Sequence, residues 1–191
     1  MSATTIPPRQ PHVPGAVIIL SVSALLMTVP GAVLARPQGL VPAAVVMATL
    51  ILAWRAPRPA PVPVRLDPRG AQWISATSAL EGVAAVGGLL ACLVAGQLPW
   101  WFPLVLGSVA IHLTAFLIWI RRRVDLVLVP VSWVGVGASV ILTVQGQWRA
   151  GWIEGGWVMT IAVLGYVLAL ATPAGNALCG PVRVERARTA G

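Results

Sequence analysis

The chain has 191 residues, of which 58% are hydrophobic and only 9% are charged, and its mean hydropathy is +0.86. A water-soluble domain of this length needs more charged surface, so the composition excludes an ordinary soluble protein. The net charge of +8 comes from thirteen arginines that lie in short segments beside apolar runs. Attraction to anionic lipid explains them better than nucleic-acid binding, so we expect the lipid bilayer and no nucleic acid as a partner.

Six apolar stretches follow one another, at residues 13–34, 38–54, 72–97, 99–120, 124–145 and 151–172. Hydrocarbon about 30 Å thick takes roughly 20 apolar residues of helix to cross, a length that every stretch except the second reaches. Inside lipid the backbone must satisfy its own hydrogen bonds, so such stretches form helices. The sequence therefore predicts an all-α polytopic membrane protein with six transmembrane helices in three antiparallel hairpins.

The segments between and beside these stretches divide the chain into five parts. Arg9 is the only basic residue before the first stretch, and the stretch is longer than the apolar core of a signal peptide. We therefore expect a retained helix, although residues 33–35 weakly resemble a cleavage site. Alternating prolines favour an extended linker between the second and third stretches. The predicted parts are a tail (1–12), a two-helix unit (13–54), a Pro/Arg-rich linker (55–71), a four-helix unit (72–172) and a basic tail (173–191).

The arginines fall almost entirely into every second gap. Eleven lie in the tails, the linker and the run 121–123, whereas the alternate gaps hold only Arg36 and Arg149. Basic loops stay cytoplasmic, so both termini are predicted to face the cytoplasm and the linker to be cytoplasmic too. The charge is carried by arginine without lysine, which hints at a GC-rich bacterial gene and hence at the inner (plasma) membrane.

Tryptophans mark both ends of the predicted helices. Indole rings prefer the headgroup level of a bilayer, so we interpret most of them as interfacial anchors. The predicted anchors are Trp54, Trp73 and Trp119 at the cytoplasmic ends, and Trp100, Trp101, Trp148, Trp152 and Trp157 at the outer ends.

Two ionisable side chains are expected deep in the membrane. Counted from the predicted ends of their helices, Glu81 and His112 lie at nearly equal depth, on helices joined by a tight turn. Ser78 and Ser108 each lie about one turn away on the same helix faces. We therefore predict a polar cluster of these four residues. It could bind a ligand or a proton, act on a lipid, or simply hold the helices together by hydrogen bonds.

The other acidic residues near the membrane have simpler explanations. Asp125 follows Arg121, Arg122 and Arg123 and begins a predicted helix, so pairing with these arginines and the helix dipole account for it. Glu154 lies near the start of the sixth stretch, about one turn past Arg149, and is expected to be structural as well.

Small residues recur at four-residue spacing in the third and fifth stretches, which predicts close helix packing. The positions are Gly82, Ala84, Gly88, Gly96, Gly135 and Ser139.

No phosphate-binding loop, zinc-protease motif or nucleophile elbow occurs in the sequence, and one histidine with one carboxylate is a poor metal site. We expect no cofactor and no metal. The leading interpretation is a non-catalytic accessory or interaction component, with a membrane-protein partner or a second copy as its partner. The alternatives are a small-molecule or proton-coupled carrier or binding protein that uses Glu81 and His112, and an intramembrane lipid-modifying enzyme.

Overall fold

The computed structural model describes residues 15–35, 37–56 and 68–172. The predictions for the two tails and for the prolines of the linker lie outside the described residues. Every regular element in these three ranges is helical, with a π-helical turn (η1) and a 3-10 turn (η2) between α-helices. The elements are α1 (Gly15–Leu34), α2 (Leu40–Arg55), α3 (Pro68–Gly82), η1 (Val83–Gly87), α4 (Gly88–Val94), η2 (Leu98–Trp100), α5 (Trp101–Trp119), α6 (Asp125–Val144) and α7 (Trp148–Ala171).

Five helical segments in the described ranges are long and apolar enough to cross a membrane: α1, α3 with α4, η2 with α5, α6, and α7. The sequence predicted six crossings. Helix α2 is apolar but has only 16 residues, or about 24 Å at about 1.5 Å per residue. It is therefore shorter than the hydrocarbon thickness of about 30 Å.

Two boundaries differ from the prediction. Helix α3 begins at Pro68, four residues before the predicted start at 72, since proline at the first turn of a helix sacrifices no hydrogen bond. Helix α7 begins at Trp148 rather than at 151, so Arg149 belongs to its first turn and not to the preceding loop.

Helices α3 and α4 form one long rod that contains the π-helical turn Val83–Gly87. A π turn shifts the helical hydrogen-bond pattern by one residue, which leaves a backbone carbonyl open to another donor. The indole Nε1 of Trp101 in α5 donates to the carbonyl oxygen of Ala85 at 2.9 Å. This bond ties the irregular turn to the neighbouring helix.

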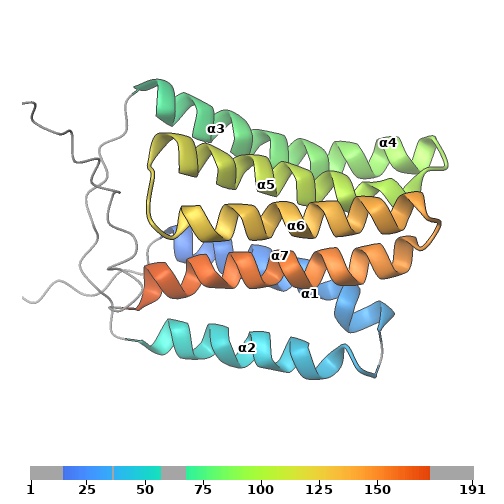
Figure 1. The fold of residues 1–191 in the computed structure, drawn as a ribbon, viewed down its shortest axis with the longest axis horizontal. Coiled ribbons are helices and arrows are strands. Elements are labelled where there is room, and N and C mark those ends of the chain that lie inside the picture. Colours follow the sequence, from blue (N-terminus) through green and yellow to red (C-terminus); the bar gives the residue numbers. More distant parts are fainter. Residues whose placement is uncertain (1–14, 36, 57–67, 173–191) are drawn as a thin grey trace, which may run out of the picture.

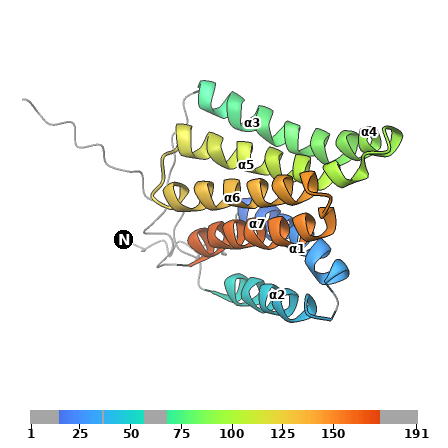
Figure 2. The ribbon, with the colours of Figure 1, turned by 45° about the vertical axis from the view of Figure 1, so that its right-hand side comes forward.

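Helix α7 lies in the middle of the bundle (Figure 1). It packs against α1, α2, α5 and α6, whereas the rod of α3 and α4 packs on α5. The largest buried side chains near the centre include Leu106, Leu113, Met159 and Tyr166. Figure 2 shows the same order of helices from a second direction, with α2 and α3 at opposite sides of the bundle.

Helices α6 and α7 approach closely because small residues face each other. A Cβ atom placed on Gly155 would lie 2.7 Å from the Cβ of Ser139 and 2.9 Å from the carbonyl oxygen of Gly135. Ser139 is fully buried. Two of the predicted packing positions, Gly135 and Ser139, thus lie in a helix–helix contact.

The small residues predicted to pack in the third stretch do not all lie in a helix–helix contact. Gly88 and Ala84 line a shallow groove beside α5, but nothing lies within 4 Å of a Cβ built on Gly82 or Gly96. Gly96 is not in a helix at all. Gly96 has a φ of +66°, a left-handed conformation that suits glycine at the end of a helix. Helix α4 ends here, and the N–H groups of Gly96 and Gln97 donate to the carbonyl oxygens of Leu93 and Cys92.

All described tryptophans except Trp133 and Trp157 lie near helix ends. Trp157 is nine residues inside α7, where its ring lies against Gly31 of α1. It is therefore a packing residue rather than the predicted anchor, because the start of α7 at Trp148 moves it inward. The others stay near the ends of their helices: Trp54, Trp73 and Trp119 at one end of the bundle, and Trp100, Trp101, Trp148 and Trp152 at the other.

Described arginines also divide between the two ends. One end, at the left of Figure 1, is where α2 ends, α3 begins, and α5 is joined to α6. It carries Arg55, Arg69 and the run 121–123, and we call it the arginine end. The opposite end carries Arg149 alone among the arginines that the structure describes.

Candidate functional site

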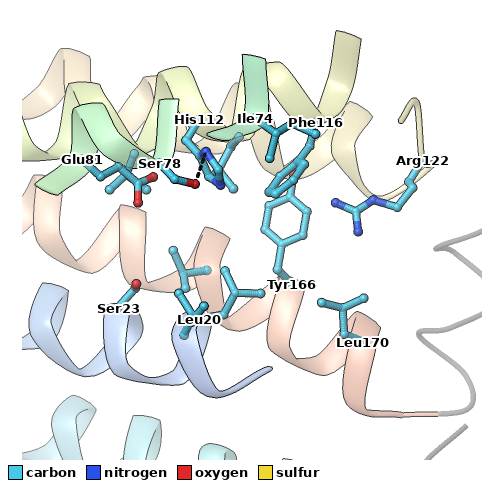
Figure 3. Close-up of a pocket in the computed structure, with 14 residues that line it drawn as sticks. Leu20, Ser23, Ile74, Ser78, Glu81, His112, Phe116, Arg122, Tyr166 and Leu170 are labelled. Atoms are coloured by element: carbon cyan, nitrogen blue, oxygen red, sulfur yellow. Dashed lines mark hydrogen bonds between the residues drawn. The ribbon is translucent and has the colours of Figure 1, made fainter. Parts of the chain in front are cut away.

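A cavity of about 530 Å³ lies between α1, α3, α5 and α7, and Figure 3 shows it in close-up. Its polar lining side chains are Ser23, Ser78, Glu81, His112, Arg122 and Tyr166. Its other lining residues are Ile19, Leu20, Ile74, Val109, Leu113, Phe116, Val163 and Leu170. The cavity is thus mainly apolar with a few polar groups, the usual composition of a small-molecule site.

His112 is held by hydroxyl groups of the neighbouring helix. Its Nδ1 lies 2.9 Å from Thr77 Oγ1 and 3.4 Å from Ser78 Oγ, and its ring meets the Phe116 ring edge to face at 4.7 Å. Thr77 Oγ1 is also 3.0 Å from the carbonyl oxygens of Trp73 and Ile74. If the threonine hydroxyl donates to one of those carbonyls, it accepts from the Nδ1–H, and the Nε2 atom remains for another partner.

Glu81 lines the same cavity but does not contact His112. The prediction placed the two at equal depth because it counted from the wrong start of α3. A Cβ on Gly70 would lie 3.1 Å from the Trp119 ring, so Gly70 and Trp119 mark one level. Glu81 is eleven residues beyond Gly70 and His112 is seven residues before Trp119, or about 16 Å and about 10 Å along the helices. Glu81 therefore lies roughly one helical turn deeper than His112, which is too far for a contact between their side chains.

The Glu81 carboxylate has no hydrogen bond or ion pair with any residue in the described ranges. In Figure 3 it lies at the end of the cavity remote from Arg122, on the same helix as Ser78. An ionisable side chain deep in an apolar helix is costly and is rarely left without a role.

Ser108 is not part of this cluster. Its hydroxyl donates to the carbonyl of Val105, one turn earlier in α5, at 2.8 Å. Ser108 lines a separate groove together with Ala84 and Gly88. The structure thus brings Ser78, Glu81 and His112 to one cavity and places the fourth predicted member elsewhere.

Arg122 closes the cavity at the arginine end. Its side chain reaches inward and its guanidinium lies over the rings of Phe116 and Tyr166, at 5.1 and 5.6 Å. Asp125 is fully buried and pairs with this guanidinium at 3.2 Å, while it also accepts the Arg122 backbone N–H at 2.9 Å. The charge of Arg122 is therefore balanced within the protein.

The other predicted charge pair is not formed in the structure. Glu154 and Arg149 are exposed, no ion pair joins them, and Arg149 instead lies over the Trp148 ring at 5.3 Å. Arg121 and Arg123 are exposed too, and of the three consecutive arginines only Arg122 pairs with Asp125.

One side of the cavity is open. Helices α1 and α3 line it from opposite sides but do not pack against each other. Ile19 of α1 and Ser78 of α3, which face the gap, are exposed. A molecule could therefore enter sideways, between two helices, without passing either end of the bundle.

Among the polar and aromatic residues that line the cavity, Ser23, Phe116 and Tyr166 were not predicted from the sequence. Phe116 follows His112 by one turn, so helical spacing could have suggested it. Nothing in the sequence links Ser23 of α1 or Tyr166 of α7 to α3, because these helices are far apart along the chain.

Within the described ranges, no three or more His, Cys, Asp or Glu side chains come close enough to hold a metal ion. Comparison of the chain with models of protein families, with curated proteins and with solved structures gave no match.

Proposed function

We propose that this protein is a multi-pass protein of the cell membrane that binds a small amphipathic molecule in the cavity between α1, α3, α5 and α7. The observation that carries the proposal is the cavity itself: about 530 Å³, mainly apolar, with Ser78, Glu81 and His112 in its wall. Pockets of a few hundred cubic ångströms with a few convergent polar groups are the usual ligand sites of proteins.

The lateral opening favours a ligand that dissolves in the bilayer. If the bundle spans a membrane, the gap between α1 and α3 faces lipid, and a ligand can reach the cavity from the hydrocarbon. This proposal follows the alternative expected from the sequence, a small-molecule or proton-coupled carrier or binding protein that uses Glu81 and His112, rather than the leading accessory role. A membrane-protein partner or a second copy of the chain stays a prediction.

The geometry favours binding over catalysis. A nucleophile must reach both its general base and the substrate. The hydroxyl closest to His112 belongs to Thr77, which is buried and does not line the cavity. Ser78 does line it, but its hydroxyl is 3.4 Å from the imidazole. A lipid-modifying reaction stays the weaker alternative.

For the membrane topology, we propose six crossings as three antiparallel hairpins, with both termini on the cytoplasmic side. The concentration of described arginines at one end of the bundle supports this orientation. Helix α2 would cross despite its 16 residues, because the terminal Arg55 can extend towards the headgroups and the bilayer can thin locally. Tags on the two termini should be accessible only from the cytoplasmic side, and opposite accessibility would refute this arrangement.

The binding proposal is tested with protein in lipid nanodiscs and three bulky aromatic probes of different charge: tetraphenylphosphonium, triphenylphosphine oxide and tetraphenylborate. At least one probe should bind saturably to the wild-type protein. Ser23→Trp, which places a large ring inside the cavity, should abolish that binding. Val29→Trp adds the same ring on an exposed face of the same helix and should leave it unchanged. If no probe binds, or if both variants behave alike, the proposal is wrong.

A further inference from the structure

The charged and titratable groups around the cavity differ in whether they have a partner within the protein. Arg122 already has Asp125 as its counter-ion and two aromatic rings beneath it. His112 is hydrogen-bonded through Nδ1 to α3. Only the Glu81 carboxylate lacks a partner among the described residues. An incoming charge that the site can balance is therefore a positive one.

We propose that the ligand is a lipophilic organic cation whose positive group binds at Glu81 and whose apolar body lies along α1, α5 and α7. This inference rests on the proposed function and names the class of ligand for the same cavity. The wall of the same cavity offers Leu20, Val109 and Val163 to an apolar body. An anionic ligand would gain no counter-ion from Glu81 and would compete with Asp125 for Arg122.

The hydroxyls near Glu81 fit the same ligand class. Ser78 lies one turn before Glu81 on α3, and Ser23 lies across the cavity on α1 (Figure 3). A hydroxyl oxygen accepts hydrogen bonds from an ammonium group. The site therefore offers one carboxyl group, which becomes negative when a cation replaces its proton, and two neutral acceptors, with the fully charged Arg122 held at the other end of the cavity.

Binding of a cation should release a proton. A lone carboxylate in hydrocarbon is costly, so we expect the carboxyl group to hold its proton in the empty cavity. A bound cation supplies the missing counter-charge: the carboxylic acid and the free cation become a carboxylate–cation pair plus one proton in solution. The other titratable or charged groups facing the cavity are His112 from α5, Arg122 with Asp125 at the start of α6, and the phenol of Tyr166 from α7. None of the lining residues of α1 is titratable.

Tetraphenylphosphonium carries a permanent charge, so its binding isolates the protonation of the protein. In nanodiscs the wild-type protein should bind it at least tenfold more tightly than triphenylphosphine oxide or tetraphenylborate. Its affinity should fall on acidification, approaching about tenfold per pH unit where one proton competes with one cation. Affinity for the neutral probe should not depend on pH.

Glu81→Gln should reduce the affinity for the cation at least tenfold and remove its pH dependence, while Glu81→Asp, which keeps the charge, should retain both in part. Glu154→Gln makes the same change at an exposed carboxylate outside the cavity and should alter neither. His112→Gln should keep the pH slope, since Glu81 is the group that exchanges the proton.

The outcomes separate this inference from the proposed function. If a neutral or anionic probe binds best and Ser23→Trp abolishes that binding, the cavity binds a ligand but the assignment of a cation is overturned. If cation binding survives Glu81→Gln, or if His112→Gln removes the pH dependence, the role of Glu81 is overturned. If no probe binds the wild-type protein, both proposals fail.

Discussion

Replacement of Gly155 by alanine tests whether α6 and α7 pack as closely as the structure describes. The added Cβ would lie 2.7 Å from Ser139 Cβ, 2.9 Å from the carbonyl oxygen of Gly135 and 2.9 Å from Leu106 Cδ1. Two of these atoms belong to the neighbouring helix and one of them is backbone, so a side-chain rotation cannot relieve the clash. The helices would have to separate along their length.

Overpacking of a tightly packed core typically costs about 1–3 kcal/mol, which corresponds to a roughly 5- to 150-fold loss in the folding equilibrium constant. Gly137→Ala is the matched control, because nothing lies within 4 Å of a Cβ at that position of α6. There alanine should be neutral or slightly stabilising, since it favours helix over glycine.

The assay is reversible unfolding of the purified protein in mixed micelles by increasing fractions of sodium dodecyl sulfate, followed by far-ultraviolet circular dichroism. Gly155→Ala should unfold at a lower fraction of the denaturing detergent than both the wild type and Gly137→Ala. Equal stability of the two variants would refute the close contact between α6 and α7.

Two further predictions concern polar contacts and use the same unfolding assay. Asp125→Asn should destabilise the protein by about 3–5 kcal/mol, because it leaves the buried guanidinium of Arg122 without a counter-ion. An unchanged unfolding midpoint would contradict the buried ion pair. Trp101→Phe should lower the free energy of unfolding by about 1 kcal/mol, because it removes the hydrogen bond to the Ala85 carbonyl. Trp100→Phe is the control, at a residue for which the structure shows no such bond, and should lower it less. A reversed order would mean that the π turn does not depend on the Trp101 indole.

Much of the helical architecture is visible in the sequence because lipid imposes a simple requirement on length and polarity. The apolar stretches 99–120 and 124–145 correspond closely to η2 with α5 and to α6. The start of the third helix was harder to locate. Pro68, Arg69 and Gly70 resemble a continuation of the linker in composition, but they form the first turn of α3, where proline is tolerated and Gly70 packs on a tryptophan ring.

The candidate site was predictable only in part. Glu81 and His112 stand out as ionisable residues within apolar stretches, and both line one cavity. Their relative depth depends on which residues of α3 and α5 face each other, and an error of one helical turn decides whether they touch. Thr77, not Glu81, is level with the imidazole.

The sequence by itself determined that the chain forms long apolar helices, where most of them begin and end, and which of their residues are ionisable. Hydropathy carries this information because a helix in lipid must be long enough and apolar enough along its whole length. The tertiary structure alone decided which faces of these helices meet, that α1 lines a cavity with α3 without packing on it, and that Glu81 has no partner among the described residues. A face that packs on another helix and a face that meets lipid are both apolar, so the sequence pattern does not distinguish them, and only the packing of the helices against one another does.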